Sequence, residues 1–255
     1  MEKPWRKLSC IVLVVGLCVT THFGSVYAQT TDFNDSQITE KTYIDPDIYQ
    51  MINDYERGTF VERNEDEDIN AKQILDSFGT TSETSTTADI KYLYDVKELD
   101  SNTYAATRIA LYSSLRQENQ DEKNGVIVFC RIVYELKDFG KPWGFLKLTG
   151  VESGVVRNND NYWCEFLKMR YRVYGSAYDA NGNRLGVKGR ETDYNDTATV
   201  NSPTVGHTYS INGPNDYYYS MGEIDSVIAG FARANISFRL SSSEYLEVSS
   251  AIQAI

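Results

Sequence analysis

Residues 126–136 read Val-Ile-Val-Phe-Cys-Arg-Ile-Val-Tyr-Glu-Leu, and they are the clearest indication of the fold class in the chain. Alternate positions point to opposite faces of an extended strand. One face of this stretch carries only apolar or aromatic residues, whereas the other carries Ile127 and Phe129 beside Arg131 and Glu135. Because a strand that is largely apolar on both faces belongs in the middle of a covered sheet, the stretch predicts a central β-strand.

The same period of two continues over much of the chain after residue 88. Further strand candidates are 90–96, 103–115, 143–148, 162–178, 227–240 and 245–252. Turn sequences separate several of them, and Asn181-Gly182 is a strong hairpin signal. Many strands without a βαβ rhythm favour two packed antiparallel layers or a closed sheet. We therefore predict a mainly β protein whose residues 89–255 form an antiparallel β-sandwich or barrel-like domain.

The candidate strand 162–178 shows a simpler alternation. Apolar Trp163 and Leu167 alternate with basic residues such as Arg170, so one face is expected to meet water. Glu165 shares the apolar side of this alternation, where burial would raise the pKa of its carboxyl group. Glu165 is therefore a candidate for carboxylate chemistry, and a pair with an arginine is the alternative.

Residues 29–78 have a different pattern. Asp45 and Pro46 suit a helix start, and Ile48, Met51 and Ile52 then share one helical face. We predict a short acidic α-helical segment over residues 29–78, with a second helix near its end. A Thr/Ser-rich linker at 79–88 then leads into the β domain. Docking on that domain, mobility and a role as a pro-region all remain open for this segment.

Residues 1–28 carry a basic start, an apolar run at 8–19 and small residues before Gln29. This is the pattern of a secretory signal peptide cleaved after Ala28. Thr20, Thr21 and His22 interrupt the run before it reaches the length of a membrane span. We therefore expect a secreted, extracellular protein without a stable membrane anchor.

The chain of 255 residues is acidic, with a formal net charge of −11. Loss of residues 1–28 would remove three basic residues and one acidic residue and bring the charge to −13. Such a charge repels nucleic acids and anionic membranes, so we expect no nucleic-acid partner. A neutral, cationic or sugar-like partner is favoured.

Cys130 and Cys164 are the two cysteines that remain after cleavage of the leader. Two cysteines in an exported chain predict a disulfide bond between them. His207 is the single histidine of the mature chain, so neutral and soft ligands are too few for a closed zinc site. We expect no metal ion and no cofactor.

The remaining functional signal is aromatic. Tyr217, Tyr218 and Tyr219 follow a loop-like sequence, and Trp143 follows a turn. Tyrosine and tryptophan can stack on sugar rings or anchor a protein partner, so these four are the candidate ligand-binding residues.

No motif in the chain identifies a reaction, because a Gly-x-Ser-x-Gly elbow is absent from the sequence and His207 alone makes a weak case for a base. We therefore expect an extracellular binding protein for a carbohydrate or protein ligand and lean against an enzyme. Two alternatives stay open. One is a carboxylate-dependent, carbohydrate-active hydrolase, and the other is a β-pore-forming toxin whose membrane hairpin would come from residues 192–210.

Overall fold

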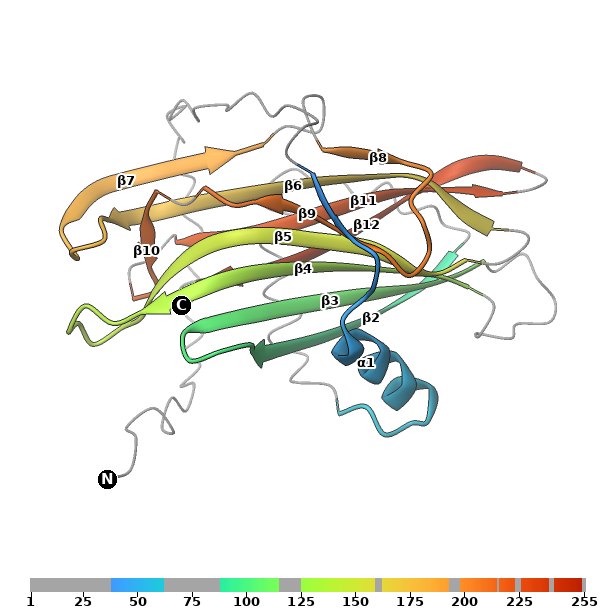
Figure 1. Ribbon diagram of the computed structural model, residues 1–255, viewed down its shortest axis with the longest axis horizontal. Helices are drawn as coiled ribbons and strands as arrows, with labels where there is room; N and C mark the ends of the chain where they lie inside the picture. The colour runs from blue at the N-terminus through green and yellow to red at the C-terminus, as the bar shows by residue number, and fades with distance from the viewer. Residues whose placement is uncertain are drawn as a thin grey trace, which may run out of the picture.

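The computed structural model describes residues 38–61, 88–114, 125–158, 162–192, 198–214, 216–222, 226–238 and 241–253. This part of the chain contains twelve β-strands and one α-helix, which confirms a mainly β protein. The elements are β1 (Thr39–Lys41), α1 (Pro46–Glu56), β2 (Ala88–Glu98), β3 (Thr103–Ser114), β4 (Val126–Lys137), β5 (Phe145–Arg157), β6 (Tyr162–Tyr178), β7 (Arg184–Glu191), β8 (Thr199–Asn201), β9 (Thr208–Asn212), β10 (Tyr218–Ser220), β11 (Val227–Phe238) and β12 (Ser241–Gln253) (Figure 1).

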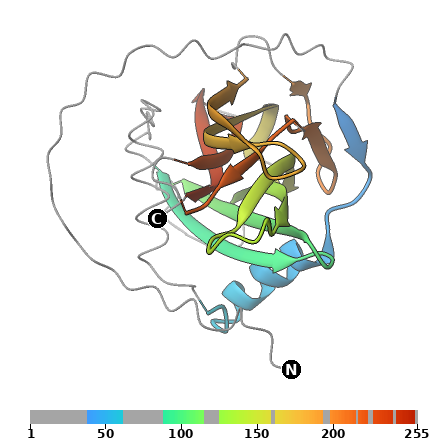
Figure 2. The same ribbon diagram turned by 90° about the vertical axis from the view of Figure 1, so that its left-hand side faces the viewer.

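The strands form one antiparallel sheet in the order β12-β11-β6-β10-β5-β4-β3-β2. In addition, β7 and β8 pair with β6, β9 pairs with β5, and β1 pairs with β9. The sheet curls into a half-barrel, as the view in Figure 2 shows. The curl brings β12 over β3, where the Ser250 hydroxyl donates a hydrogen bond of 2.7 Å to the main-chain oxygen of Ala106. The expected sandwich or barrel-like class is confirmed.

The opening stretch of the sequence is β4, and it lies between β3 and β5. Val128, Cys130 and Ile132 of β4 are fully buried in the core inside the half-barrel. Ile127 and Phe129 are buried on the outer face, in the cluster that includes α1. The structure therefore confirms that β4 is central and explains its two apolar faces, because β11 and β12 cover one and α1 covers the other.

Helix α1 begins at Pro46, directly after Asp45, as the sequence predicts. Its buried residues Ile48, Met51 and Ile52 form the outer cluster with four side chains of the sheet, Leu93, Ile109, Ile127 and Phe129. Strand β1 precedes the helix and pairs with β9. The second predicted helix lies outside the described residues, and so does the linker except for Ala88, at which β2 begins. The domain boundary stays a prediction.

The predicted Asn181-Gly182 hairpin joins β6 to β7. Asp179 accepts hydrogen bonds at Oδ1 from the main-chain N–H groups of Asn181 and Asn183, at 2.8 and 2.9 Å. Gly182 has a φ of +82°, which a residue without a Cβ adopts without steric cost. The side chain of Asp179 and the freedom of Gly182 thus fix a tight turn.

Strand β6 follows the expected alternation only beyond residue 165. Leu167 and Met169 are fully buried, as predicted. A β-bulge, however, shifts the register with β11, so that Asn235 lies opposite Phe166, Ile236 lies opposite Cys164, and Glu165 is the extra residue between them. The extra residue reverses the alternation, so that Trp163 is 39% exposed and Glu165 is exposed as well. The expectation that both lie on the apolar face was wrong for this reason.

Candidate functional site

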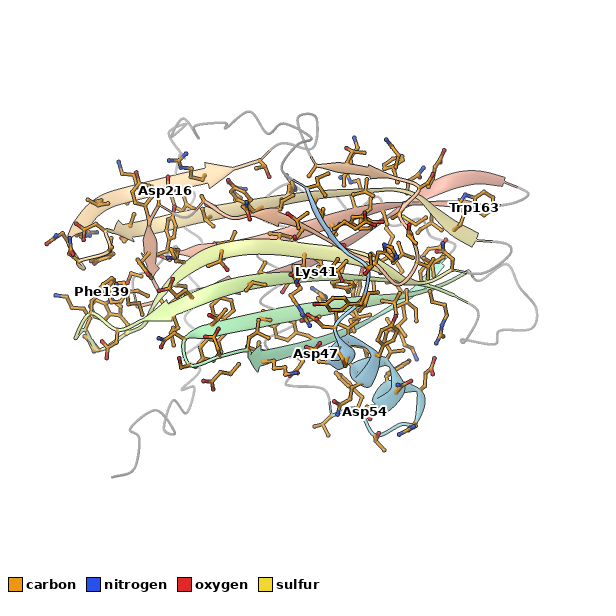
Figure 3. The ribbon with its side chains drawn as sticks, in the orientation of Figure 1. Lys41, Asp47, Asp54, Phe139, Trp163 and Asp216 are labelled. Carbon is orange, nitrogen blue, oxygen red and sulfur yellow. The ribbon has the colours of Figure 1, made fainter. Side chains whose placement is uncertain are left out.

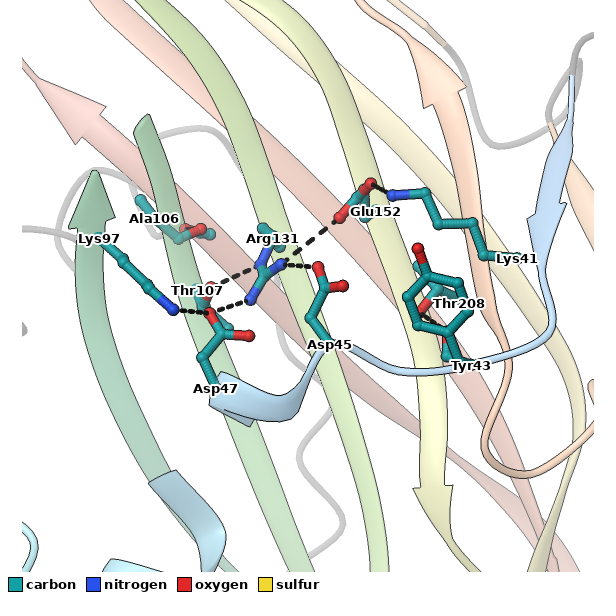
Figure 4. A network of polar contacts seen from close by, with 11 residues as sticks. Lys41, Tyr43, Asp45, Asp47, Lys97, Ala106, Thr107, Arg131, Glu152 and Thr208 are labelled. Carbon is teal, nitrogen blue, oxygen red and sulfur yellow. Dashed lines mark hydrogen bonds and ion pairs between the residues drawn. The ribbon is translucent and has the colours of Figure 1, made fainter. Parts of the chain in front are cut away.

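A network of charged side chains joins the N-terminal segment to the outer face of the sheet (Figure 4). Its centre is Arg131 of β4, whose side chain is 1% exposed. The guanidinium donates hydrogen bonds of 2.6 Å to Asp45 and to Asp47, which lie at the start of α1. Its Nε donates a third, of 2.8 Å, to the hydroxyl of Thr107. A buried arginine needs such partners around its whole fork, and here all three nitrogens have one.

Two lysines extend this network. Lys41 of β1 donates a hydrogen bond of 2.7 Å to Glu152 of β5, and that bond raises the pKa of Lys41. Glu152 also lies 3.7 Å from Arg131, and Lys97 lies 3.9 Å from Asp47. Three cations therefore face three carboxylates. We call this set the Arg131 clamp, defined by Arg131, Asp45, Asp47, Glu152, Lys41 and Lys97, because it fixes residues 41–47 on the sheet.

The segment held by the clamp presents exposed aromatic rings. Tyr43 is 57% exposed and Tyr49 is 40% exposed, and Val205, in the turn before β9, is 43% exposed. The main-chain oxygen of Tyr43 accepts a hydrogen bond of 2.9 Å from Thr208. The hydroxyl of Tyr49 lies 3.9 Å from the point where a Cβ on Gly206 would stand. Both tyrosines thus border the turn before β9, and with Val205 they form what we call the tyrosine patch.

The sequence interpretation missed this patch. Tyr49 does not share the helical face of Ile48 and Ile52, so its position on α1 was a usable signal for exposure. Tyr43 offered no such signal, because it lies in the short connection between β1 and α1. Arg131 did offer one, since a charged residue within a covered strand requires buried partners.

His207 lies next to the tyrosine patch in the chain. Its Nδ1 donates a hydrogen bond of 2.7 Å to the carboxylate of Glu40 on β1, and this bond lowers the pKa of Glu40. In addition to the strand pairing, this contact links β1 to β9 beside it. His207 therefore helps to hold the N-terminal segment against β9, and this structural role accounts for its position without a role as a catalytic base.

The four aromatic residues proposed from the sequence lie at the end of the molecule marked by Phe139 (Figure 3) and differ in exposure. Tyr218 and Tyr219 are buried, and Tyr217 and Trp143 are half-buried. Tyr218 packs edge-on against Phe139, with ring centroids 5.4 Å apart. These rings mainly fill the protein, and their contact with a ligand stays a prediction.

A set of polar side chains, Glu135, Lys147 and the hydroxyl of Tyr218, borders this aromatic cluster. The hydroxyl of Tyr218 donates a hydrogen bond of 2.6 Å to Glu135, and Lys147 lies 2.7 Å from the other carboxylate oxygen. Partial burial alone would raise the pKa of Glu135, but these two hydrogen bonds outweigh it and the pKa is lowered. Burial, together with the bond to Glu135, raises the pKa of Tyr218. A carboxylate held ionised by a lysine and a phenol is a stable contact and a poor general acid.

The predicted disulfide bond is absent. Cys130 and Cys164 are both buried free thiols. They lie on β4 and β6, which are not neighbours in the sheet, so no cross-strand pairing brings them together. The prediction was wrong because it rested on elimination alone, without knowledge of the strand order.

The environment of Cys164 also makes it a weak nucleophile. Burial raises its pKa to about 12, and its Sγ donates a hydrogen bond of 3.2 Å to the main-chain oxygen of Phe166. The test uses the protein without residues 1–28, in which Cys130 and Cys164 are the two cysteines. Because the thiolate is the reactive form, we expect neither cysteine to react with iodoacetamide at neutral pH while the protein is folded. Both should react in denaturant. Mass spectrometry counts the added groups, and the single variants Cys130→Ser and Cys164→Ser assign them. Rapid alkylation of the native protein would contradict this expectation.

The remaining findings concern metal ions, membranes and similarity to known proteins. No group of histidine, cysteine, aspartate and glutamate within the described ranges is arranged to hold a metal ion. No helix in that same part of the chain is both long enough and apolar enough to cross a membrane. Comparison with protein-family models, with curated proteins and with solved structures finds no match to this chain.

Proposed function

We propose that the protein is exported after cleavage of residues 1–28 and acts outside the cell as a binding protein. Its ligand is a carbohydrate or a protein, and the binding surface is the tyrosine patch. The basic and apolar pattern of the leader supports export. The exposed rings of Tyr43 and Tyr49 support binding, and they are the observation that carries the proposal.

A tyrosine ring offers a flat apolar face and a polar edge, so it can stack on a sugar or fill the centre of a protein interface. Both tyrosines lie on a segment whose base is fixed by the Arg131 clamp and by the main-chain contact with Thr208. A surface that is already ordered loses little conformational freedom when a ligand binds. Rings held in this way suit recognition better than rings on a loose loop.

The charges near the patch limit the class of ligand. Within the described residues, Lys41 is paired with Glu152, and the carboxylate of Glu40 is hydrogen-bonded to His207. These contacts leave no excess of positive charge, and the chain as a whole carries a formal net charge of −11. A neutral sugar or a neutral to basic protein surface fits these charges better than a polyanion.

The double substitution Tyr43→Ala and Tyr49→Ala tests the patch. Because exposed aromatic anchors each contribute roughly 1–2 kcal/mol, the double variant should bind its ligand at least about tenfold more weakly. Protein recovered from the culture medium is applied to an array of neutral oligosaccharides and to intact cells, and bound protein is quantified. The control is Trp163→Ala, which removes another exposed aromatic ring at the end of the molecule away from Phe139 (Figure 3). Equal binding by the double variant and the unchanged protein would exclude the tyrosine patch as the binding surface.

A further inference from the structure

Strand β7 forms an open edge of the sheet (Figure 1). It pairs with β6 along one side, and no described strand pairs with its other side. Alternate main-chain N–H and C=O groups of an edge strand point away from its single neighbour. An extended peptide can satisfy these groups by adding itself as a further strand.

The side chains of β7 leave this edge accessible. Leu185 is 40% exposed and Val187 is 51% exposed, and Lys188, next to Gly189, is exposed as well. The hairpin turn at Asp179–Asn183 holds one end of the strand in place. The edge therefore combines a fixed backbone with two apolar side chains that a partner strand can cover.

The charge of the β6–β7 hairpin is opposite to that of the chain. Residues 162–192 contain six lysines and arginines and three aspartates and glutamates, whereas the whole chain has a formal net charge of −11. Lys168, Arg170 and Arg172 occupy alternate positions of β6, on the face opposite to buried Met169 and Tyr171. Arg184 and Lys188 continue the basic character along β7 itself, whereas Arg190 is already paired with Asp216. An approaching strand thus meets a basic element.

We propose that the outer edge of β7 binds an acidic, extended peptide of a partner protein as an added β-strand. This site is separate from the tyrosine patch and does not depend on it. The basic residues determine which strand can be added. Strand β7 carries three basic residues and one acidic residue, so a second copy would bring together two strands of like net charge, which disfavours self-pairing. Glutamates on a partner strand turn the same charges into attraction.

The probe is a fluorescein-labelled peptide of sequence Glu-Val-Glu-Thr-Glu-Val-Glu, titrated with the full mature protein and followed by fluorescence anisotropy. We expect saturable binding with a Kd below about 1 mM. Two peptides test the two parts of the proposal on unchanged protein. One has alternate amides N-methylated, which removes its hydrogen-bond donors, and the other has lysine in place of every glutamate. Each should bind at least roughly tenfold more weakly.

A pair of protein variants locates the site. Lys188→Glu reverses a charge on β7 and should weaken binding of the acidic peptide roughly threefold or more. Lys91→Glu makes the same change at an exposed position of β2, which lies several strands away from β6 in the sheet, and should leave the affinity unchanged. Equal affinity for the N-methylated peptide would show attraction by charge alone and overturn the proposal. Absence of saturable binding, or equal loss in both variants, would overturn it as well.

Discussion

Replacing Arg131 with methionine should lower the free energy of unfolding by about 3 kcal/mol, because removal of one partner from a buried ion pair leaves the other charge unbalanced. Asp45 and Asp47 would lose their hydrogen bonds of 2.6 Å at the start of α1. Helix α1 has only 11 residues and depends on its contacts with the sheet. Urea denaturation measures the free energy, and limited proteolysis should show earlier cleavage within residues 38–61.

Arg157→Met is the matched control for this variant. Arg157 also forms a salt bridge with the N-terminal segment, to Glu56 at 2.9 Å, but its side chain is 34% exposed. Exposed pairs contribute about 0–1 kcal/mol, so this variant should remain close to the unchanged protein. Similar stabilities for the two variants would contradict the central role that we assign to Arg131. If the tyrosine patch binds the ligand, Arg131→Met should also weaken that binding, although Arg131 itself is buried.

Gly230→Ala should destabilise the protein by about 3 kcal/mol, because added atoms in a filled core force neighbouring side chains apart. A Cβ at Gly230 of β11 would stand 2.5 Å from Cγ2 of Ile132 and 3.0 Å from both methyl groups of Val151. The change therefore forces β11 away from β4 and β5 at the point where the two sides of the half-barrel meet. Thermal unfolding followed by circular dichroism should show the loss, and Gly230→Val should fail to fold cooperatively.

A double-mutant cycle separates this clash from a change in backbone flexibility. Ile132→Ala removes the methyl group that the new Cβ would meet, at the cost of a cavity. If the contact is the cause, the double variant Gly230→Ala with Ile132→Ala should be more stable than the sum of the two single effects allows. Strict additivity would instead point to the loss of glycine's flexibility.

The sequence predicted those parts of the fold that depend on local patterns. Residues 126–136 indicated a covered central strand because both alternating sets are largely apolar, and β4 has that position. Asp45 and Pro46 predicted the start of α1, and Asn181-Gly182 predicted the hairpin that leads into β7. In each case the residues that indicate the structure are neighbours in the chain, so no knowledge of tertiary contacts is required.

The parts that were missed depend on contacts between distant segments. The bulge at Glu165 is set by pairing with β11 and inverted the expected exposure of Trp163. The disulfide prediction failed because it required the order of β4 and β6 in the sheet. The tyrosine patch is formed only when α1 approaches the turn before β9. Strand β1 has three residues and β7 has two glycines in eight, so neither shows a clear period of two.

The contact of β12 with β3 has a consequence for the order of folding. The hydrogen bond from Ser250 to Ala106 joins residues 144 positions apart, and β11 and β12 together cover the inner faces of β3 and β4. A nascent chain that has emerged only as far as β9 would display those faces to water. Proteins dominated by such long-range contacts fold slowly. We therefore expect completion of the core to wait until β11 and β12 are available, with the β2–β5 meander dependent on chaperones until then.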